Sequence, residues 1–144
     1  MNGPTIDSLR EGMAFSFEEK ITIGMVDAFA SLSGDFNPLH MDEDFARERG
    51  YRQRVVHGEL LGALFSRLVG MYCPGRNALL HSMNLRFRNP AYPGTIIRVS
   101  GEIEQVSVEN KVVVMKLEAV DAVDCTIYAT GKAQAGFLPR REEI

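Results

Sequence analysis

Cysteine and histidine are scarce in this sequence, and their spacing excludes the sites that they most often build. The 144 residues include two cysteines, Cys73 and Cys125, and three histidines, His40, His57 and His81. The cysteines lie 52 positions apart, so neither belongs to a Cys-x-x-Cys pair or to a zinc-binding spacing. The histidines lie in different segments, without the spacing that places two ligands on one helix. We therefore expect no disulfide framework and no metal site.

An excess of positive charge and long apolar runs are also lacking. Sixteen lysines and arginines stand against nineteen acidic residues, for a net charge of −3, whereas nucleic-acid binders usually carry a basic excess. Charged residues interrupt every apolar stretch well short of a membrane-spanning length. The first residues also lack the basic and then apolar pattern of a secretory signal. We expect a cytoplasmic protein with neither a nucleic-acid nor a membrane partner.

The length and composition are typical of one soluble domain. The chain is 45% hydrophobic and 24% charged, as in ordinary globular proteins. A chain of this length leaves no room for two domains of usual size, and it contains no repeat or linker. We expect a single domain over residues 1–144.

The first part of the chain predicts short elements separated by turns. Residues Met13–Ile21 suit an opening strand, and the apolar spacing in Ile23–Leu32 predicts a helix that Gly34 ends. Pro38 cannot continue that helix, because it lacks a backbone N–H group. A second short helix is expected from Asp42, as its cap, to about Arg49.

The segment Gly58–Tyr72 is apolar on nearly every side of a helix, which is typical of a buried helix. Its small or polar residues Glu59, Gly62, Ser66 and Gly70 recur every three or four positions and form one narrow stripe. Another backbone or a ligand can approach closely along such a stripe.

The rest of the chain predicts antiparallel strands, since apolar and polar residues alternate in it. On one face of the first of these strands the alternation places Leu79, His81, Met83 and Leu85. The fold class that follows is α+β, with a curved antiparallel sheet wrapped around one long buried helix. The expected strands are Leu79–Phe87, Thr95–Glu104, Lys111–Val120 and Cys125–Ala135.

Asp35 and His40 are the first candidates for chemistry. A stiff Phe-Asn-Pro-Leu spacer separates them, and a carboxylate beside an imidazole can share one water molecule and pass a proton at neutral pH. Taken alone, the pattern also fits a turn residue followed by a histidine near a helix start.

The wider pattern narrows these alternatives. Gly-Asp-Phe-Asn-Pro-Leu-His at positions 34–40, followed by Val-Val-His-Gly at positions 55–58, resembles the MaoC-like (R)-specific enoyl-CoA hydratases, which have the hot-dog fold. The resemblance covers about residues 23–70. It implies a hydro-lyase that reversibly adds water to a trans-2-enoyl thioester, giving an (R)-3-hydroxyacyl thioester. It also implies that no cofactor is needed, because coenzyme A is part of the substrate.

Carried over residue by residue, the resemblance makes Asp35 and His40 the catalytic dyad. Gly58 corresponds to the position whose backbone N–H stabilises the negative charge on the thioester oxygen, and its place at a helix start suits that role. Asn37 is expected to orient the loop of the dyad, and Ser66 corresponds to a serine near the substrate. Ser66 can equally bond back to its own helix.

Two further functions remain open at this stage. Hot-dog thioesterases place a carboxylate near the start of the same helix, where this chain has Glu59. A non-catalytic, acyl-binding dimer subunit is the other alternative. If Glu59 instead lines the acyl tunnel, a preference for short or polar acyl groups is expected, because a carboxylate is costly to desolvate.

The other two histidines and two arginines of the first long strand are expected to have structural roles. His57 is predicted to fix the turn before the helix, and His81 to lie in the core or in an interface. Arg86 and Arg88 are expected on a solvated strand face. The expected partners are an acyl-coenzyme A or acyl-carrier-protein thioester and, since a single bent sheet leaves open edges, a second copy of the chain.

Overall fold

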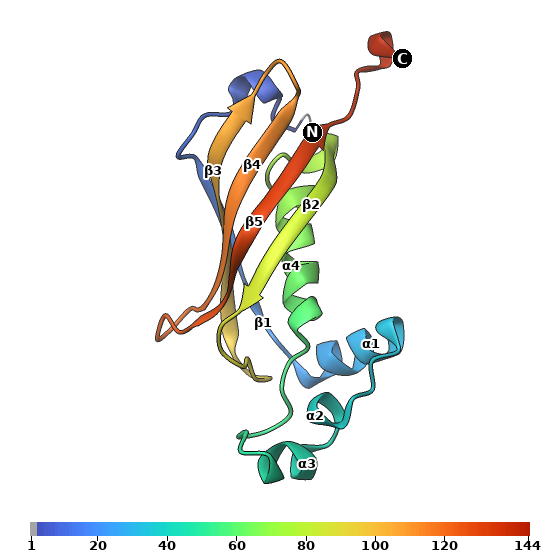
Figure 1. The fold of residues 1–144 in the computed structure, drawn as a ribbon, viewed down its shortest axis with the longest axis vertical. Coiled ribbons are helices and arrows are strands. Elements are labelled where there is room, and N and C mark those ends of the chain that lie inside the picture. The colour runs from blue at the N-terminus through green and yellow to red at the C-terminus, as the bar shows by residue number, and fades with distance from the viewer. Residues whose placement is uncertain (1–2) are drawn as a thin grey trace.

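The computed structural model describes residues 3–144, and its main feature is a curved antiparallel sheet (Figure 1). In the described residues the sheet has five strands in the order β1-β3-β4-β5-β2, and every neighbouring pair is antiparallel. β2 and β1 are therefore its edges. The strands are β1 (Ala14–Lys20), β2 (Ala78–Phe87), β3 (Ile96–Ser107), β4 (Val112–Asp121) and β5 (Ile127–Phe137).

One long helix lies along a face of this sheet, and three shorter helices gather beyond the end of the sheet where the long helix begins (Figure 1). The long helix is α4 (Gly58–Met71), and the others are α1 (Ile23–Ser33), α2 (Pro38–Met41) and α3 (Glu43–Glu48). Short 3₁₀ turns lie at Ile6–Ser8, Gly75–Asn77 and Arg141–Glu143. This arrangement confirms the α+β expectation of a sheet packed on one helix.

Local sequence signals explain where the first helices begin and end. The backbone of Gly34 has a φ of 78° and ends α1 in the left-handed conformation, which glycine adopts without steric cost. The side chain of Asp42 accepts a hydrogen bond from the Phe45 N–H and caps α3. The one-turn helix α2 was not expected, and it forms because Asn37 caps it and Pro38 occupies its first position.

α4 is buried against the sheet on one side, and in the single chain its other side is exposed over more residues than the expected stripe of Glu59, Gly62, Ser66 and Gly70. The sheet covers the side that carries Leu60, Leu61, Gly62, Leu64, Phe65, Leu68 and Val69. The close packing of α4 on β3 depends on Gly101 of β3, because a Cβ atom at Gly101 would lie 2.9 Å from Cδ2 of Leu68. The side left exposed carries Glu59, Ala63, Ser66, Arg67, Gly70 and Met71.

A β-bulge in β2 overturns part of the expected alternation. The register of β2 against β5 shifts between Leu80 and Ser82, so His81 is an extra residue on its strand. Because one inserted residue reverses the faces of its neighbours, Leu80 turns inward and Leu79 is 56% exposed. His81 is exposed as well, so of its two predicted places, the core or an interface, the core is wrong and the interface stays a prediction.

The exposed ring of His81 lies against the backbone of β5. A Cβ atom at Gly136 would come within 2.6 Å of this ring, and Nε2 of Gln134 lies 3.3 Å from its Nδ1. Among residues 3–144, no helix combines the length and the apolar character that a membrane span requires.

Candidate active site

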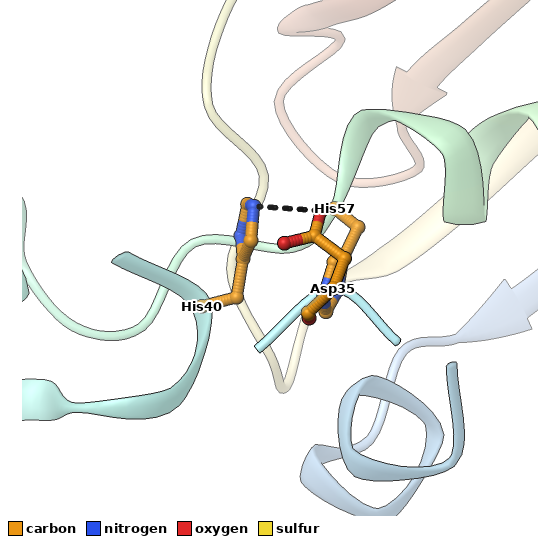
Figure 2. Close-up of side chains that lie close together, drawn as sticks. All are labelled: Asp35, His40 and His57. Atoms are coloured by element: carbon orange, nitrogen blue, oxygen red, sulfur yellow. Dashed lines mark hydrogen bonds and ion pairs between the residues drawn. The ribbon is translucent and has the colours of Figure 1, made fainter. Parts of the chain in front are cut away.

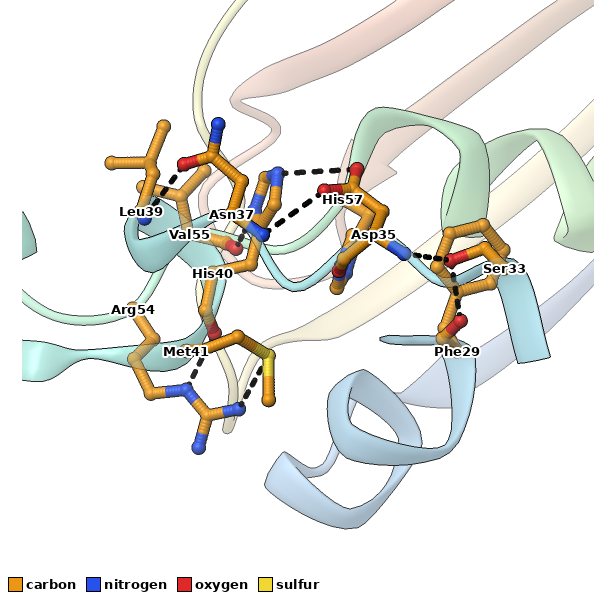
Figure 3. A network of polar contacts seen from close by, with 10 residues as sticks. All are labelled: Phe29, Ser33, Asp35, Asn37, Leu39, His40, Met41, Arg54, Val55 and His57. Atoms are coloured by element: carbon orange, nitrogen blue, oxygen red, sulfur yellow. Dashed lines mark hydrogen bonds and ion pairs between the residues drawn. The ribbon is translucent and has the colours of Figure 1, made fainter. Parts of the chain in front are cut away.

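Asp35 is held in a tight loop directly after α1. Its backbone N–H donates to Oγ of Ser33 at 3.1 Å, and that hydroxyl in turn donates to the carbonyl of Phe29 at 2.7 Å (Figure 3). Oδ1 of Asp35 accepts a hydrogen bond from the backbone N–H of Asn37 at 3.2 Å. These bonds orient one carboxylate oxygen toward the loop and leave Oδ2 free to face His40.

His40 presents one particular nitrogen to Asp35. Its Nδ1 lies 2.6 Å from the carbonyl oxygen of Val55, and because a carbonyl only accepts, Nδ1 carries the proton. Nε2 is then the unprotonated nitrogen of the neutral ring, and it lies 4.0 Å from Oδ2 of Asp35 (Figure 2). That separation is too long for a direct hydrogen bond, but one water oxygen at about 2.8 Å from each atom can span it.

His57 packs against both members of this pair. Its ring stacks on the His40 ring with centroids 3.9 Å apart and planes 25° apart, and the Phe29 ring lies tilted against the His57 ring with centroids 4.9 Å apart. Nε2 of His57 lies 3.0 Å from the carbonyl oxygen of Asp35 and donates to it. His57 makes no side-chain hydrogen bond to the start of α4, so its predicted role in fixing that turn stays a prediction. Its contacts instead anchor the Asp35 loop and support the ring of His40.

Asp35, His40 and His57 form the one cluster of potential metal ligands found among the described residues, with one donor atom of each within 4.8 Å of the others. Two of the four ring nitrogens already face carbonyl oxygens. The in-plane lone pairs of two stacked rings also cannot both point at one ion about 2.1 Å away. The geometry suits water activation better than metal binding.

Gly58 begins α4 beside the dyad. The first N–H groups of a helix have no partner within the helix and carry its positive end. A Cβ atom at Gly58 would lie 3.0–3.2 Å from the ring of Phe87, so only glycine fits under this ring without displacing it. Gly58, His40 and Phe87 line a pocket of about 320 Å³.

The stripe of small and polar residues on α4 lines a second pocket of about 410 Å³. Glu59, Gly62 and Ser66 supply its helix side, and Phe29 and Phe87 are among its other walls. Ser66 is two turns, or about 12 Å, along the helix from Gly58, so the structure places it with Glu59 rather than with the dyad.

Asn37 acts through its neighbours. Its Oδ1 accepts from the Leu39 N–H at 2.9 Å and caps α2, which carries His40. This contact supports the expectation that Asn37 orients the loop, and no contact in the described residues aims its amide at the dyad.

Two further contacts that support or flank the dyad were not predicted from the sequence. Nε of Arg54 donates to the backbone carbonyl of His40, and the Arg54 guanidinium pairs with Asp27 of α1. Neither this contact nor the place of Phe87 over Gly58 has a sequence signal, because both join segments far apart in the chain. The stacking of His57 on His40 had one signal in the sequence, namely the position of His57 in the Val-Val-His-Gly motif.

The cysteines lie outside this site. Cys73 follows the C-terminal end of α4, about 21 Å along the helix from the dyad. Burial raises the pKa of the Cys73 thiol to about 11, so it is not a thiolate at neutral pH. Nucleophilic thiol chemistry is therefore not a function of this pocket.

The arrangement suits acid–base chemistry at an activated carbonyl compound. A carboxylate and an imidazole face a gap of water size, and helix N–H groups begin beside them at Gly58. Together they can move a proton and stabilise negative charge on a carbonyl oxygen.

Comparisons with known proteins agree with this chemistry. A family model described as "MaoC like domain" matches residues 8–123, and the chain belongs to this family. The (R)-specific enoyl-CoA hydratase of Aeromonas caviae is 38% identical over 97 residues, which cover 67% of this chain and 71% of that protein. A mitochondrial 3-hydroxyacyl-[acyl-carrier-protein] dehydratase of Arabidopsis thaliana is 41% identical over 88 residues, which cover 61% of this chain and 48% of that protein.

Solved structures confirm the expected hot-dog fold. The (R)-hydratase from A. caviae involved in PHA biosynthesis superimposes with a TM-score of 0.86 at 30% identity, and the match covers 92% of this chain and 98% of that one. The unliganded R-hydratase PhaJ1 from Pseudomonas aeruginosa gives a TM-score of 0.87 at 25% identity, over 94% of this chain and 86% of that one.

Proposed function

We propose that this chain catalyses the reversible hydration of a trans-2-enoyl thioester to an (R)-3-hydroxyacyl thioester. The observation that carries the proposal is the 4.0 Å gap between Nε2 of His40 and Oδ2 of Asp35, at the end of the sheet where α4 begins. The names of the relatives from A. caviae and A. thaliana support the same reaction class.

In the proposed reaction the dyad holds one water molecule against C3 of the enoyl group. As the water oxygen bonds to C3, the dyad accepts one of its protons, and C2 receives a proton from the same acid–base system. The C2=C3 electron pair moves toward the thioester, and the charge on the thioester oxygen is stabilised by the N–H of Gly58. Losing a preorganised donor of this kind typically costs about 3 kcal/mol.

The proposal needs no cofactor, since coenzyme A or an acyl carrier protein enters with the acyl group. The pocket lined by His40 and Gly58 is also lined by Arg88 and Asn89. Both are exposed and can contact the coenzyme A or acyl-carrier-protein part of the substrate. A homodimer is part of the proposal, because β2 is an open edge and one side of α4 is exposed.

A single assay separates this function from its two alternatives. Purified protein is mixed with crotonyl-CoA, and the enoyl absorbance and the free thiol are followed together. We expect the absorbance to fall without thiol release. Thiol release would favour a thioesterase that uses Glu59, and neither change would favour a non-catalytic acyl-binding subunit; either result would contradict hydration.

A further inference from the structure

The pocket beside α4 lies next to the pocket that holds His40 and Gly58, and the two share one lining side chain. Phe87 lines this pocket and also the pocket that holds His40 and Gly58. Phe29, on the opposite wall, contacts the ring of His57, which stacks on His40. An acyl chain that leaves the reacting carbons along α4 would meet this second pocket next.

The walls of this second pocket are apolar, except on the helix side. Met83 and Leu85 of β2 join the two phenylalanines, and such surfaces favour alkyl groups. Glu59 supplies the negative charge on that side. Its carboxylate lies over Gly62, because a Cβ atom at Gly62 would be only 3.1 Å from Oε2 of Glu59. Within residues 3–144, no ion pair joins Glu59 to a cationic side chain.

We propose that Glu59 is a specificity-determining residue, which makes this pocket accept four-carbon or hydroxylated acyl groups and reject long alkyl chains. The inference rests on the proposed function. Glu59 is exposed in the single chain, and its carboxylate is hydrated there. A long alkyl chain laid between α4 and β2 covers the carboxylate and removes that water without offering a hydrogen bond, which is costly. A four-carbon group stops short of it, and a hydroxyl can donate to it.

The experiment compares kcat/KM for four-carbon and eight-carbon trans-2-enoyl-CoA in the wild type, Glu59→Gln and Glu59→Met. We expect the wild type to favour the four-carbon substrate by about tenfold or more, since burying an unpaired carboxylate against an alkyl chain is unfavourable. Glu59→Met should shift the ratio toward eight carbons by at least about tenfold. Glu59→Gln, which keeps the shape, should shift it less.

A matched control is Glu102→Gln, which removes a charge from an exposed position on β3 and should leave the ratio unchanged. The inference is overturned if the wild type favours the eight-carbon substrate, or if both Glu59 variants keep the wild-type ratio. Hydration of both substrates with equal efficiency would overturn it while leaving the proposed function standing. If the wild type hydrates neither substrate, the proposed function fails and the inference fails with it.

Discussion

At the scale of single residues, the direction of one hydrogen bond decides which nitrogen of His40 can take a proton. The carbonyl of Val55 holds the N–H on Nδ1, so Nε2 is the free base, and it is the nitrogen that faces Asp35. The second tautomer would place a proton between the two groups and leave the carbonyl of Val55 without a donor. The backbone thus selects the tautomer that the proposed chemistry needs.

We predict that His57→Phe lowers kcat for crotonyl-CoA by about tenfold to a hundredfold with a smaller change in KM. Phenylalanine keeps a ring against His40 but cannot donate to the carbonyl of Asp35, so the dyad loop loses an anchor, and small misplacements of catalytic groups are costly. His57→Gln retains a donor near the position of Nε2 and should recover part of kcat. Both are measured by steady-state kinetics.

The pH profile separates positioning by His57 from proton transfer by it. In both variants the apparent pKa values of the kcat/KM profile should stay those of the wild type. His81→Gln, on the exposed bulge of β2, is the matched control and should keep full activity. Full kcat in His57→Phe, or the loss of one limb of the profile, would contradict a positioning role.

At the scale of elements, the site depends on three segments that meet where α4 begins. The loop after α1 carries Asp35, α2 carries His40, and residues 55–58 join them to the sheet. Hydrogen bonds from the Val55 N–H to the Leu39 carbonyl at 3.1 Å and from the Val56 N–H to the Ala91 carbonyl at 2.9 Å hold these segments together. Catalytic groups on loops are thereby held by a rigid scaffold.

A second hydrogen-bond network lies in the turn between β4 and β5, and it bears on the stability of the fold. Asp121 accepts hydrogen bonds from the N–H groups of Val123 and Asp124 and from the Tyr128 hydroxyl. The bond from Val123 is the main reason that the pKa of Asp121 lies below its usual value of 3.8. Burial first, and then the nearby carboxylate, raise the pKa of Tyr128 to about 12.

We predict that Asp121→Asn lowers the free energy of unfolding at pH 7 and that this difference shrinks near pH 3. A carboxyl whose folded pKa is depressed stabilises the fold above its unfolded pKa, and the contribution is lost as the pH falls through the folded value. Urea unfolding of both proteins at the two pH values measures it. Glu109→Gln, exposed in the turn between β3 and β4, should show neither effect; an equal loss in Asp121→Asn at both pH values would contradict the prediction.

Sequence patterns predicted the helices and strands better than they predicted which side chains contact one another. Alternation in β3 was confirmed at Ile97 and Val99, which are fully buried. The predicted alternation failed at His81 in β2, because a β-bulge inserts one extra residue there and nothing in the composition of the strand signals it. The motif at positions 34–40 predicted that Asp35 and His40 lie together, since the spacer between them is short and stiff. The contacts of Arg54 and Phe87 join distant segments, and they could not be seen in a single sequence.

At the scale of the whole molecule, apolar surface remains uncovered on neighbouring elements. Met71, at the end of α4, is 76% exposed, and Leu79 and Phe87 of β2 are 56% and 49% exposed. β2 is also an edge of the sheet, with backbone groups free to pair with another strand. A second copy of the chain placed along β2 would cover both features.

We predict that the protein sediments as a dimer of about 32 kDa, twice the 16.0 kDa of the chain, at micromolar concentration. Leu79→Asp should raise the dimer dissociation constant by about tenfold or more, because a carboxylate would be buried at the edge. Val123→Asp, at an 86% exposed position in the β4–β5 turn, should not. Monomers alone in the wild type at this concentration would contradict the proposed dimer.

The central claim, that Asp35 and His40 together activate water, is tested most directly by the turnover of crotonyl-CoA in Asp35→Asn. The Asp35 side chain is 49% exposed and supports no part of the core, so the variant should fold with an unchanged melting temperature. Since a general acid–base group contributes about 10²–10⁴-fold, we predict that kcat falls by at least about a hundredfold. Near-full turnover by a folded Asp35→Asn would contradict the claim.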